Sequence, residues 1–170
     1  LIGGSKNAFL DAYIYRLNIS GFTGSVITTL ISGGGADGIA LENSLSAIVQ
    51  RFTGDVYRLD LSTYVATLLL MTVSGEGDLT LAPTRNLALV VHQSAPAPIT
   101  RIDLTTNLQL SSLGTFIGGA GQGIALENSQ SVLVGDSGAG GLYRVDLNTG
   151  VTSRVDDGTL NGLITDISVL

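Results

Sequence analysis

The sequence of 170 residues contains no cysteine and no tryptophan, and it has a single histidine and a single methionine. Without cysteine the chain can form neither a disulfide framework nor a thiolate metal site, and this absence leaves its redox compartment undecided. Without tryptophan it lacks the stacking platforms expected of a dedicated sugar-binding lectin. These absences exclude several kinds of site before any motif is considered.

Basic residues and long apolar runs are also scarce. The 8 Lys and Arg residues stand against 14 Asp and Glu residues, which gives a formal net charge of −6. A polyanion would meet a repulsive field, so we expect no nucleic-acid partner. Apolar residues make up 44% of the chain, but no apolar stretch reaches the roughly 18 to 20 residues of a membrane helix. We therefore expect no membrane span. Because the chain starts at Leu1 without a signal-like segment, we expect a processed or truncated product.

A short phrase returns four times along the chain. It reads Tyr-Arg-Leu-Asp or a close variant, and its arginines are Arg16, Arg58, Arg101 and Arg144, spaced by about 43 residues. A second phrase over 38–44, Gly-Ile-Ala-Leu-Glu-Asn-Ser, recurs over 123–129, with weaker copies at 77–81 and 162–164. A fixed period of this length indicates a repeat architecture rather than a biased composition.

Within the repeats the apolar residues alternate with a period of two, which is typical of β-strands. The second repeat predicts strands at 38–41, 46–50, 55–61 and 64–69, and the fourth at 123–126, 131–134, 141–147 and 151–155. The segment 146–151 places Asn and Gly where a hairpin turn needs them. Because helix patterns are nearly absent, the predicted fold class is all-β.

A four-stranded antiparallel unit of about 43 residues, repeated in tandem with glycine-rich links, is typical of a β-propeller blade. A β-sandwich rarely repeats its sequence, and the coil of a β-solenoid is usually shorter. We expect a single domain over 1–170. Its repeats are approximately 1–37 together with 162–170, then 38–76, 77–122 and 123–161.

The two ends of the chain complement one another in this pattern. Residues 1–37 hold outer strands without an innermost strand, and 162–167 predict an innermost strand without outer ones. We expect the N- and C-terminal strands to close the ring. The sequence leaves open a ring of four blades, a larger ring shared with a second copy, and a segment of a longer propeller. A homodimer or a larger assembly therefore stays open.

The second phrase, together with 131–137 and 141–150, resembles the NHL-type propeller repeats of bacterial proteins over nearly the whole chain. The resemblance implies the blade architecture. It does not select an activity, because relatives of this shape include sugar-lactone hydrolases, streptogramin lyases and binding modules. The lactonase-like enzymes bind a divalent cation through acids and amides from different blades, and that set has no position-by-position match here.

The links between blades open on the face where ligands usually enter a propeller channel. This topology places five polar side chains around one rim: Asp37, Glu76, Asp78, Gln122 and Asn161. Oxygen ligands from several blades could hold Ca²⁺ or a similar hard cation there. The alternative is a solvated acidic rim without a metal.

Other polar residues have structural interpretations. We expect the loop with His92 and Gln93 to make contacts, with His92 solvated rather than catalytic. The Arg and Asp of each first phrase are two residues apart and share a face, which favours a repeated salt bridge or backbone clamp between blades. These residues are Arg16, Arg58, Arg101, Arg144, Asp60, Asp103 and Asp146. The Glu-Asn pairs at 42–43 and 127–128 are predicted to form turns.

Two functional hypotheses follow. The first is a non-enzymatic, secreted or periplasmic β-propeller module that presents a loop-rich rim to a protein or an extracellular ligand. The second is a metal-dependent, lactonase-like hydrolase or lyase, in which a divalent cation at the channel mouth polarises a carbonyl.

Overall fold

The computed structural model describes residues 2–6, 11–18, 23–30, 35–71, 77–93, 97–116, 121–138 and 140–156, and the single residues 158, 160, 164, 167 and 169. Side chains are described within 35–71, 77–93, 98–114, 121–138 and 140–156, and at those single residues. This part of the chain is all-β, with strands and turns but no helix. It therefore contains no helix of the length and apolarity needed to cross a membrane.

The strands form four antiparallel sheets, each paired in chain order. The first sheet has three strands, β1 (Ile2–Lys6), β2 (Asp11–Asn18) and β3 (Thr23–Leu30). The second has β4 (Ala36–Leu41), β5 (Ser46–Arg51), β6 (Val56–Asp60) and β7 (Ala66–Leu70). The third has β8 (Leu79–Leu81), β9 (Leu87–Val90), β10 (Ala97–Asp103) and β11 (Leu108–Phe116). The fourth has β12 (Gly121–Leu126), β13 (Ser131–Asp136), β14 (Gly141–Asp146) and β15 (Thr152–Arg154).

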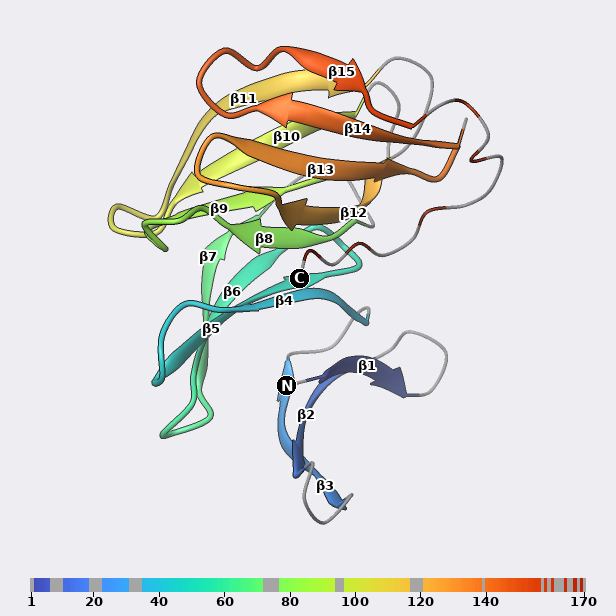
Figure 1. Cartoon of the computed structure of the whole chain (residues 1–170). Helices are drawn as coiled ribbons and strands as arrows, with labels where there is room; N and C mark the ends of the chain where they lie inside the picture. Colours follow the sequence, from blue (N-terminus) through green and yellow to red (C-terminus); the bar gives the residue numbers. More distant parts are fainter. Residues whose placement is uncertain are drawn as a thin grey trace.

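The sheets follow one another side by side (Figure 1), and their first strands are neighbours: β1 contacts β4, β4 contacts β8, and β8 contacts β12. This arrangement is that of successive propeller blades, with β4, β8 and β12 innermost. The eight strands predicted for the second and fourth repeats are confirmed, with ends that differ by a few residues. The innermost strands begin at Ala36 and Gly121, ahead of the predicted Gly38 and Gly123.

The core lies between the sheets because the strands bury both faces. In β9, Ala88 and Val90 pack with Ile48 of the second sheet, whereas Leu89 packs with Val132 of the fourth sheet on the opposite face. Successive side chains of a strand point to opposite faces, so a strand between two neighbours needs apolar residues at consecutive positions. This explains the continuous apolar run at 87–91.

The predicted hairpin at 146–151 is confirmed, and the same turn recurs after the third strand of the second and third sheets. The backbone N–H groups of Asn148 and Thr149 donate to Asp146 Oδ1, and the next residue has a positive φ. That residue is Tyr64 (60°), Asn107 (58°) or Gly150 (72°) in the three sheets. Only the fourth sheet has the glycine that this conformation favours.

Within the described residues the first sheet has three strands. The innermost strand predicted at 162–167 falls mostly outside the described residues. Of that segment the structure describes Ile164 and Ile167, and neither is assigned to a strand. A Cβ at Gly135 would lie 2.8 Å from Ile164 Cβ. Gly135 alternates with Val134, which faces the third sheet, so Ile164 covers the outward face of the fourth sheet. Closure of the ring stays a prediction.

Truncating Ile48, which is fully buried between the second and third sheets, tests the role of this packing. We expect Ile48→Ala to lower the free energy of unfolding by about 2–5 kcal/mol, because it leaves a cavity between two sheets. Chemical denaturation measures the effect. The exposed Leu108 provides the control, since Leu108→Ala is expected to change stability by no more than about 0.5 kcal/mol. Equal effects of the two substitutions would contradict this assignment of the core.

Candidate functional site

Two of the repeated arginines, Arg58 and Arg144, bind glutamates rather than the aspartates of their own phrase. Arg58 Nε and Nη2 each lie 2.9 Å from a carboxylate oxygen of Glu42 in the same sheet. Nη2 also donates to the Leu104 carbonyl of the third sheet at 2.6 Å. This is a backbone clamp between sheets, whereas the salt bridge lies within one sheet. Of the two alternatives expected between blades, this copy therefore has the backbone clamp and not the salt bridge.

The fourth sheet repeats the pair, and the third sheet lacks it. Arg144 forms a bidentate ion pair with Glu127, which also accepts from the Ser131 hydroxyl. The hydrogen bond from Arg144 has the largest effect on the pKa of Glu127, and together with the bond from Ser131 it lowers this pKa to about 2. In the third sheet Ala82 follows the innermost strand where Glu42 and Glu127 do, and Arg101 binds Ser111 of β11 instead. The side chain of Arg16 lies outside the described set.

The repeated aspartates build turns. Asp60 Oδ1 accepts from the Ser62 hydroxyl and from the backbone N–H groups of Ser62 and Thr63, and these bonds lower the pKa of Asp60 to about 2. Backbone donors likewise lower the pKa values of Asp103 and Asp146. The carboxylates prefer the charged form because it accepts these bonds.

The structure corrects the expectation that His92 is solvated. Its side chain is only 2% exposed, and Nε2 lies 2.9 Å from Thr100 Oγ1. His92 follows β9 and, by alternation with Val90, faces the second sheet. Gln93, beside it, is half-buried.

By strand register, four polar residues lie at the end of the second and third sheets where the innermost strands begin. We call Gln50, Asp78, His92 and Thr100 the inter-sheet polar cluster. Gln50 lies two residues after the core residue Ile48, and Thr100 lies two residues before the core residue Ile102. The alternation of strands therefore directs these side chains into the interface, beyond its apolar part.

Gln50 stands apart in this cluster. It is fully buried, and within the described part of the chain neither its amide nitrogen nor its amide oxygen has a hydrogen-bond partner. Buried polar groups are almost always hydrogen-bonded. The equivalent positions, by strand register, are the apolar Val91 in the third sheet and Gly135 in the fourth. The glutamine is therefore a departure from the pattern of the repeat.

Asp78 joins the innermost strands. Its Oδ1 accepts from the backbone N–H of Leu79 at 2.7 Å, and its Oδ2 accepts from the N–H of Ile124 at 3.2 Å. A Cβ on Gly38 would lie 3.0 Å from Asp78 Oδ1 and 2.7 Å from the Leu79 nitrogen, so β4 and β8 approach closely where the side chain is absent. Gly38 is also the cross-strand partner of Gln50, which places the Gln50 side chain next to this contact.

The other predicted rim residues are only partly placed. Asp37 is exposed on β4 and Gln122 is half-buried on β12, at equivalent positions where the innermost strands begin. Glu76 and Asn161 lie outside the described residues. Within the described ranges no three His, Asp or Glu side chains gather in a way that could hold a metal ion. A divalent cation at this rim stays a prediction.

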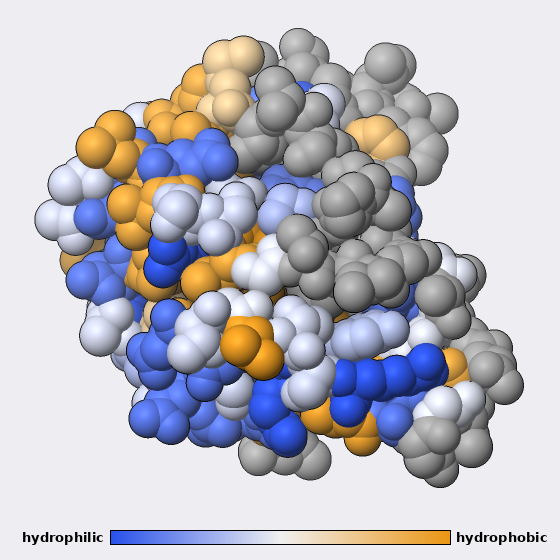
Figure 2. Space-filling model, turned by 90° about the horizontal axis from the view of Figure 1, so that it is seen from above, coloured by the Kyte–Doolittle hydropathy of each residue, from blue (hydrophilic) through white to orange (hydrophobic). Residues whose placement is uncertain are grey.

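Two hollows open elsewhere. One, of about 330 Å³, lies at the opposite end of the innermost strands and is lined by residues of three sheets, among them Leu41, Leu81 and Leu126. The other, of about 590 Å³, is lined by the turns and strands of the second sheet around Arg58 and Asp60. On the face shown in Figure 2, apolar residues are interspersed with polar ones.

Sequence reasoning missed Gln50, although a signal was present. An alignment of the repeats through their second phrases, at 38–44 and 123–129, places Gln50 opposite Gly135. A polar residue at a position that strand alternation assigns to the core could have been singled out on that ground.

Comparisons with known proteins place the chain by fold alone. No protein-family model matches the sequence, and no curated protein matches it. Among solved structures it is similar to the computationally designed Ika4 protein, with a TM-score of 0.61, 18% identity and 79% of each chain covered. It is also similar to a structural genomics protein of unknown function from Bacteroides thetaiotaomicron, with a TM-score of 0.62, 13% identity, and 75% of this chain and 33% of that chain covered.

A third similar structure is a chain of a nidogen/laminin complex, with a TM-score of 0.75, 13% identity, and 96% of this chain and 65% of that chain covered. The present chain thus spans less than two thirds of the length of these last two proteins. The similar structures include β-propeller proteins. At these identities the similarity shows a propeller-like fold and no more.

The Glu127–Arg144 pair predicts a pH dependence of stability. Because the pKa of folded Glu127 is about 2 and its ordinary value is 4.5, the unfolded chain takes up the proton first as the pH falls. The pair therefore stabilises the fold above about pH 5 and loses this effect as the pH falls towards 2. Denaturation between pH 7 and pH 2 should show a shallower decline for Glu127→Gln than for the wild type. Parallel curves for the two proteins would count against the pair.

Proposed function

We propose that this chain is a non-enzymatic β-propeller module, active outside the cytoplasm, that binds a partner protein at the channel end where β4, β8 and β12 begin. The observation that carries the proposal is the buried amide of Gln50, which has no hydrogen-bond partner within the described residues. A departure of this kind from the repeat pattern is expected mainly at functional sites.

The chemistry of a primary amide suggests what enters there. One glutamine side chain can donate and accept at the same time, which matches the N–H and C=O of a peptide main chain. Burying an amide without partners costs free energy that a bound main chain would recover. The exposed Asp37 and the net charge of −6 favour a partner segment with basic residues.

The arrangement of the remaining charges supports a binding role over catalysis. In the described residues the repeated carboxylates of Asp60 and Glu127 accept hydrogen bonds that hold turns and strands, and Asp78 accepts two backbone N–H groups. The similar chain in a nidogen/laminin complex offers an example of a protein of this fold in a protein complex.

Replacing Gln50 by leucine separates binding from stability. We expect Gln50→Leu to raise the free energy of unfolding by about 1 kcal/mol, because it removes a buried amide without partners and keeps the volume. The same substitution should weaken binding of peptides selected by phage display on the wild-type protein by at least about tenfold. Chemical denaturation and fluorescence anisotropy measure the two effects.

Gln109, an exposed glutamine on the outermost strand β11, is the matched control. Gln109→Leu should leave the affinity of the selected peptides unchanged. Selected peptides that bind Gln50→Leu as tightly as the wild type would refute the proposed site. Calcium or zinc that raises the melting temperature of the wild type but not of Asp78→Ala would favour the metal-dependent hydrolase instead.

We also propose that residues 162–170 complete the first sheet and close the ring. Ile164 lies against Gly135 of the fourth sheet. Val91 is the residue of the third sheet that is equivalent to Gly135, and it lies against Gly121 at the start of the innermost strand of the next sheet. Ile164 thus has the position expected of an innermost strand that follows the fourth sheet. Deleting 162–170 should lower the melting temperature by roughly 10 °C, because it removes an innermost strand and exposes an edge. An unchanged melting temperature would exclude closure by this segment. A solution mass of 17.5 kDa would indicate one ring per chain, and twice that mass a ring shared by two chains.

A further inference from the structure

The 330 Å³ hollow, at the opposite end of the innermost strands from Gln50, is lined by an arginine that pairs with no carboxylate among the described residues. Four of the six arginines with described side chains, Arg51, Arg58, Arg144 and Arg154, form ion pairs. Arg101 binds Ser111. Arg85 is the remaining one, and it lies on the turn between β8 and β9 in the lining of the 330 Å³ hollow.

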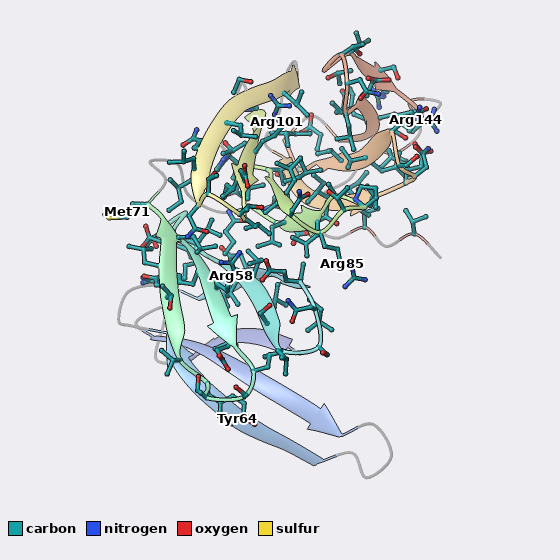
Figure 3. All side chains as sticks on the ribbon, turned by 90° about the vertical axis from the view of Figure 1, so that its left-hand side faces the viewer. Arg58, Tyr64, Met71, Arg85, Arg101 and Arg144 are labelled. Carbon is teal, nitrogen blue, oxygen red and sulfur yellow. The ribbon has the colours of Figure 1, made fainter. Side chains whose placement is uncertain are left out.

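Arg85 reaches across to the second sheet and keeps free donors. Its Nη1 donates to the Leu41 carbonyl at 3.0 Å and approaches the Glu42 carbonyl at 3.5 Å, and Figure 3 shows the side chain extending away from its own sheet. Among the described residues, Nε and Nη2 have no recorded acceptor. Because Nη1 holds the guanidinium in place, these two groups are oriented before any ligand arrives.

The carboxylates nearest in sequence to the lining residues are already neutralised. Glu42 binds Arg58 and Ser46, and Glu127 binds Arg144 and Ser131. In the third sheet, Ala82 takes the place of the glutamate. The hollow therefore has an uncompensated positive charge, in a protein whose net charge is negative.

Apart from Thr80, the rest of the lining is apolar. Leu41, Leu81, Ala40, Pro83 and Leu126 surround the hollow, and Leu41 is 51% exposed. A volume of about 330 Å³ is at the small end for ligand sites, so it suits the end of a chain rather than a large ligand. Apolar walls with one preoriented guanidinium fit an apolar side chain next to a carboxylate.

The backbone conformation of Arg85 also supports a functional role for this residue. Its φ is +55°, a conformation that costs most L-residues about 1–2 kcal/mol and that glycine adopts freely. An arginine held there carries strain that glycine would remove, and such strain is concentrated at functional positions.

We propose that this hollow binds the C-terminal end of a partner polypeptide, with the terminal carboxylate on Arg85 and an apolar last side chain among Leu41, Leu81 and Leu126. The site lies at the opposite end of the innermost strands from Gln50. Its occupation is therefore independent of the partner contact at the inter-sheet polar cluster.

Short peptides test the proposal directly. The probes are Gly-Ser-Gly-Ser-Leu with a free carboxylate, the same peptide as its C-terminal amide, and Gly-Ser-Gly-Ser-Ser with a free carboxylate. At physiological salt we expect the first to bind at least about tenfold more tightly than either of the others, because only it supplies both the charge and the apolar group. Isothermal titration calorimetry measures the affinities.

Variants identify the residue. Arg85→Gly should weaken binding of the first peptide by at least about tenfold while the melting temperature stays equal or rises, because glycine relieves the positive φ. Arg101→Ala, which changes the other arginine without a carboxylate partner, should leave the affinity unchanged. Equal affinity of the acid and the amide, or an unaffected Arg85→Gly, would overturn the site. Octanoate binding as tightly as the first peptide would overturn the assignment to a polypeptide end.

Discussion

The burial of both faces of every inner sheet is the constraint on which the rest of this structure depends. A sheet whose strands are apolar at consecutive positions cannot expose either face to water, so the second and third sheets each stand between two others. Ala88 and Val90 of β9 pack on the second sheet while Leu89 packs on the fourth. The same constraint requires a cover for the outward face of the fourth sheet, where Ile164 already lies.

Most charged groups that recur in the repeat form hydrogen bonds and ion pairs that stabilise the strands and turns of the stacked sheets. Glu42 and Glu127 orient the arginine of their own sheet, and Arg58 also reaches a carbonyl of the neighbouring sheet. Asp60, Asp103 and Asp146 shape the turns. These groups recur because each blade needs them, and recurrence in a repeat protein is therefore an argument against a specific site. Recognition is better sought where the copies differ, at Gln50 and Arg85.

The two proposed sites share a physical basis. Gln50 replaces an apolar residue of the repeat and leaves an amide without a partner, and Arg85 occupies a turn position that favours glycine. Both reduce stability in the free protein, and both supply a group that a polypeptide ligand can satisfy. They lie at opposite ends of the innermost strands, so the channel could engage two segments of one partner.

The sequence by itself determined the all-β class, the repeat and the strands of the second and fourth repeats, because alternation of apolar residues and turn chemistry are local properties. It also located the turn at Asp146. Only the tertiary structure decided which partner each charge finds: that Arg58 binds Glu42 rather than Asp60, that His92 is buried against Thr100, and that Arg85 faces a hollow made by three sheets. These contacts join residues that strand pairing and sheet stacking bring together, and no periodicity along the chain specifies them.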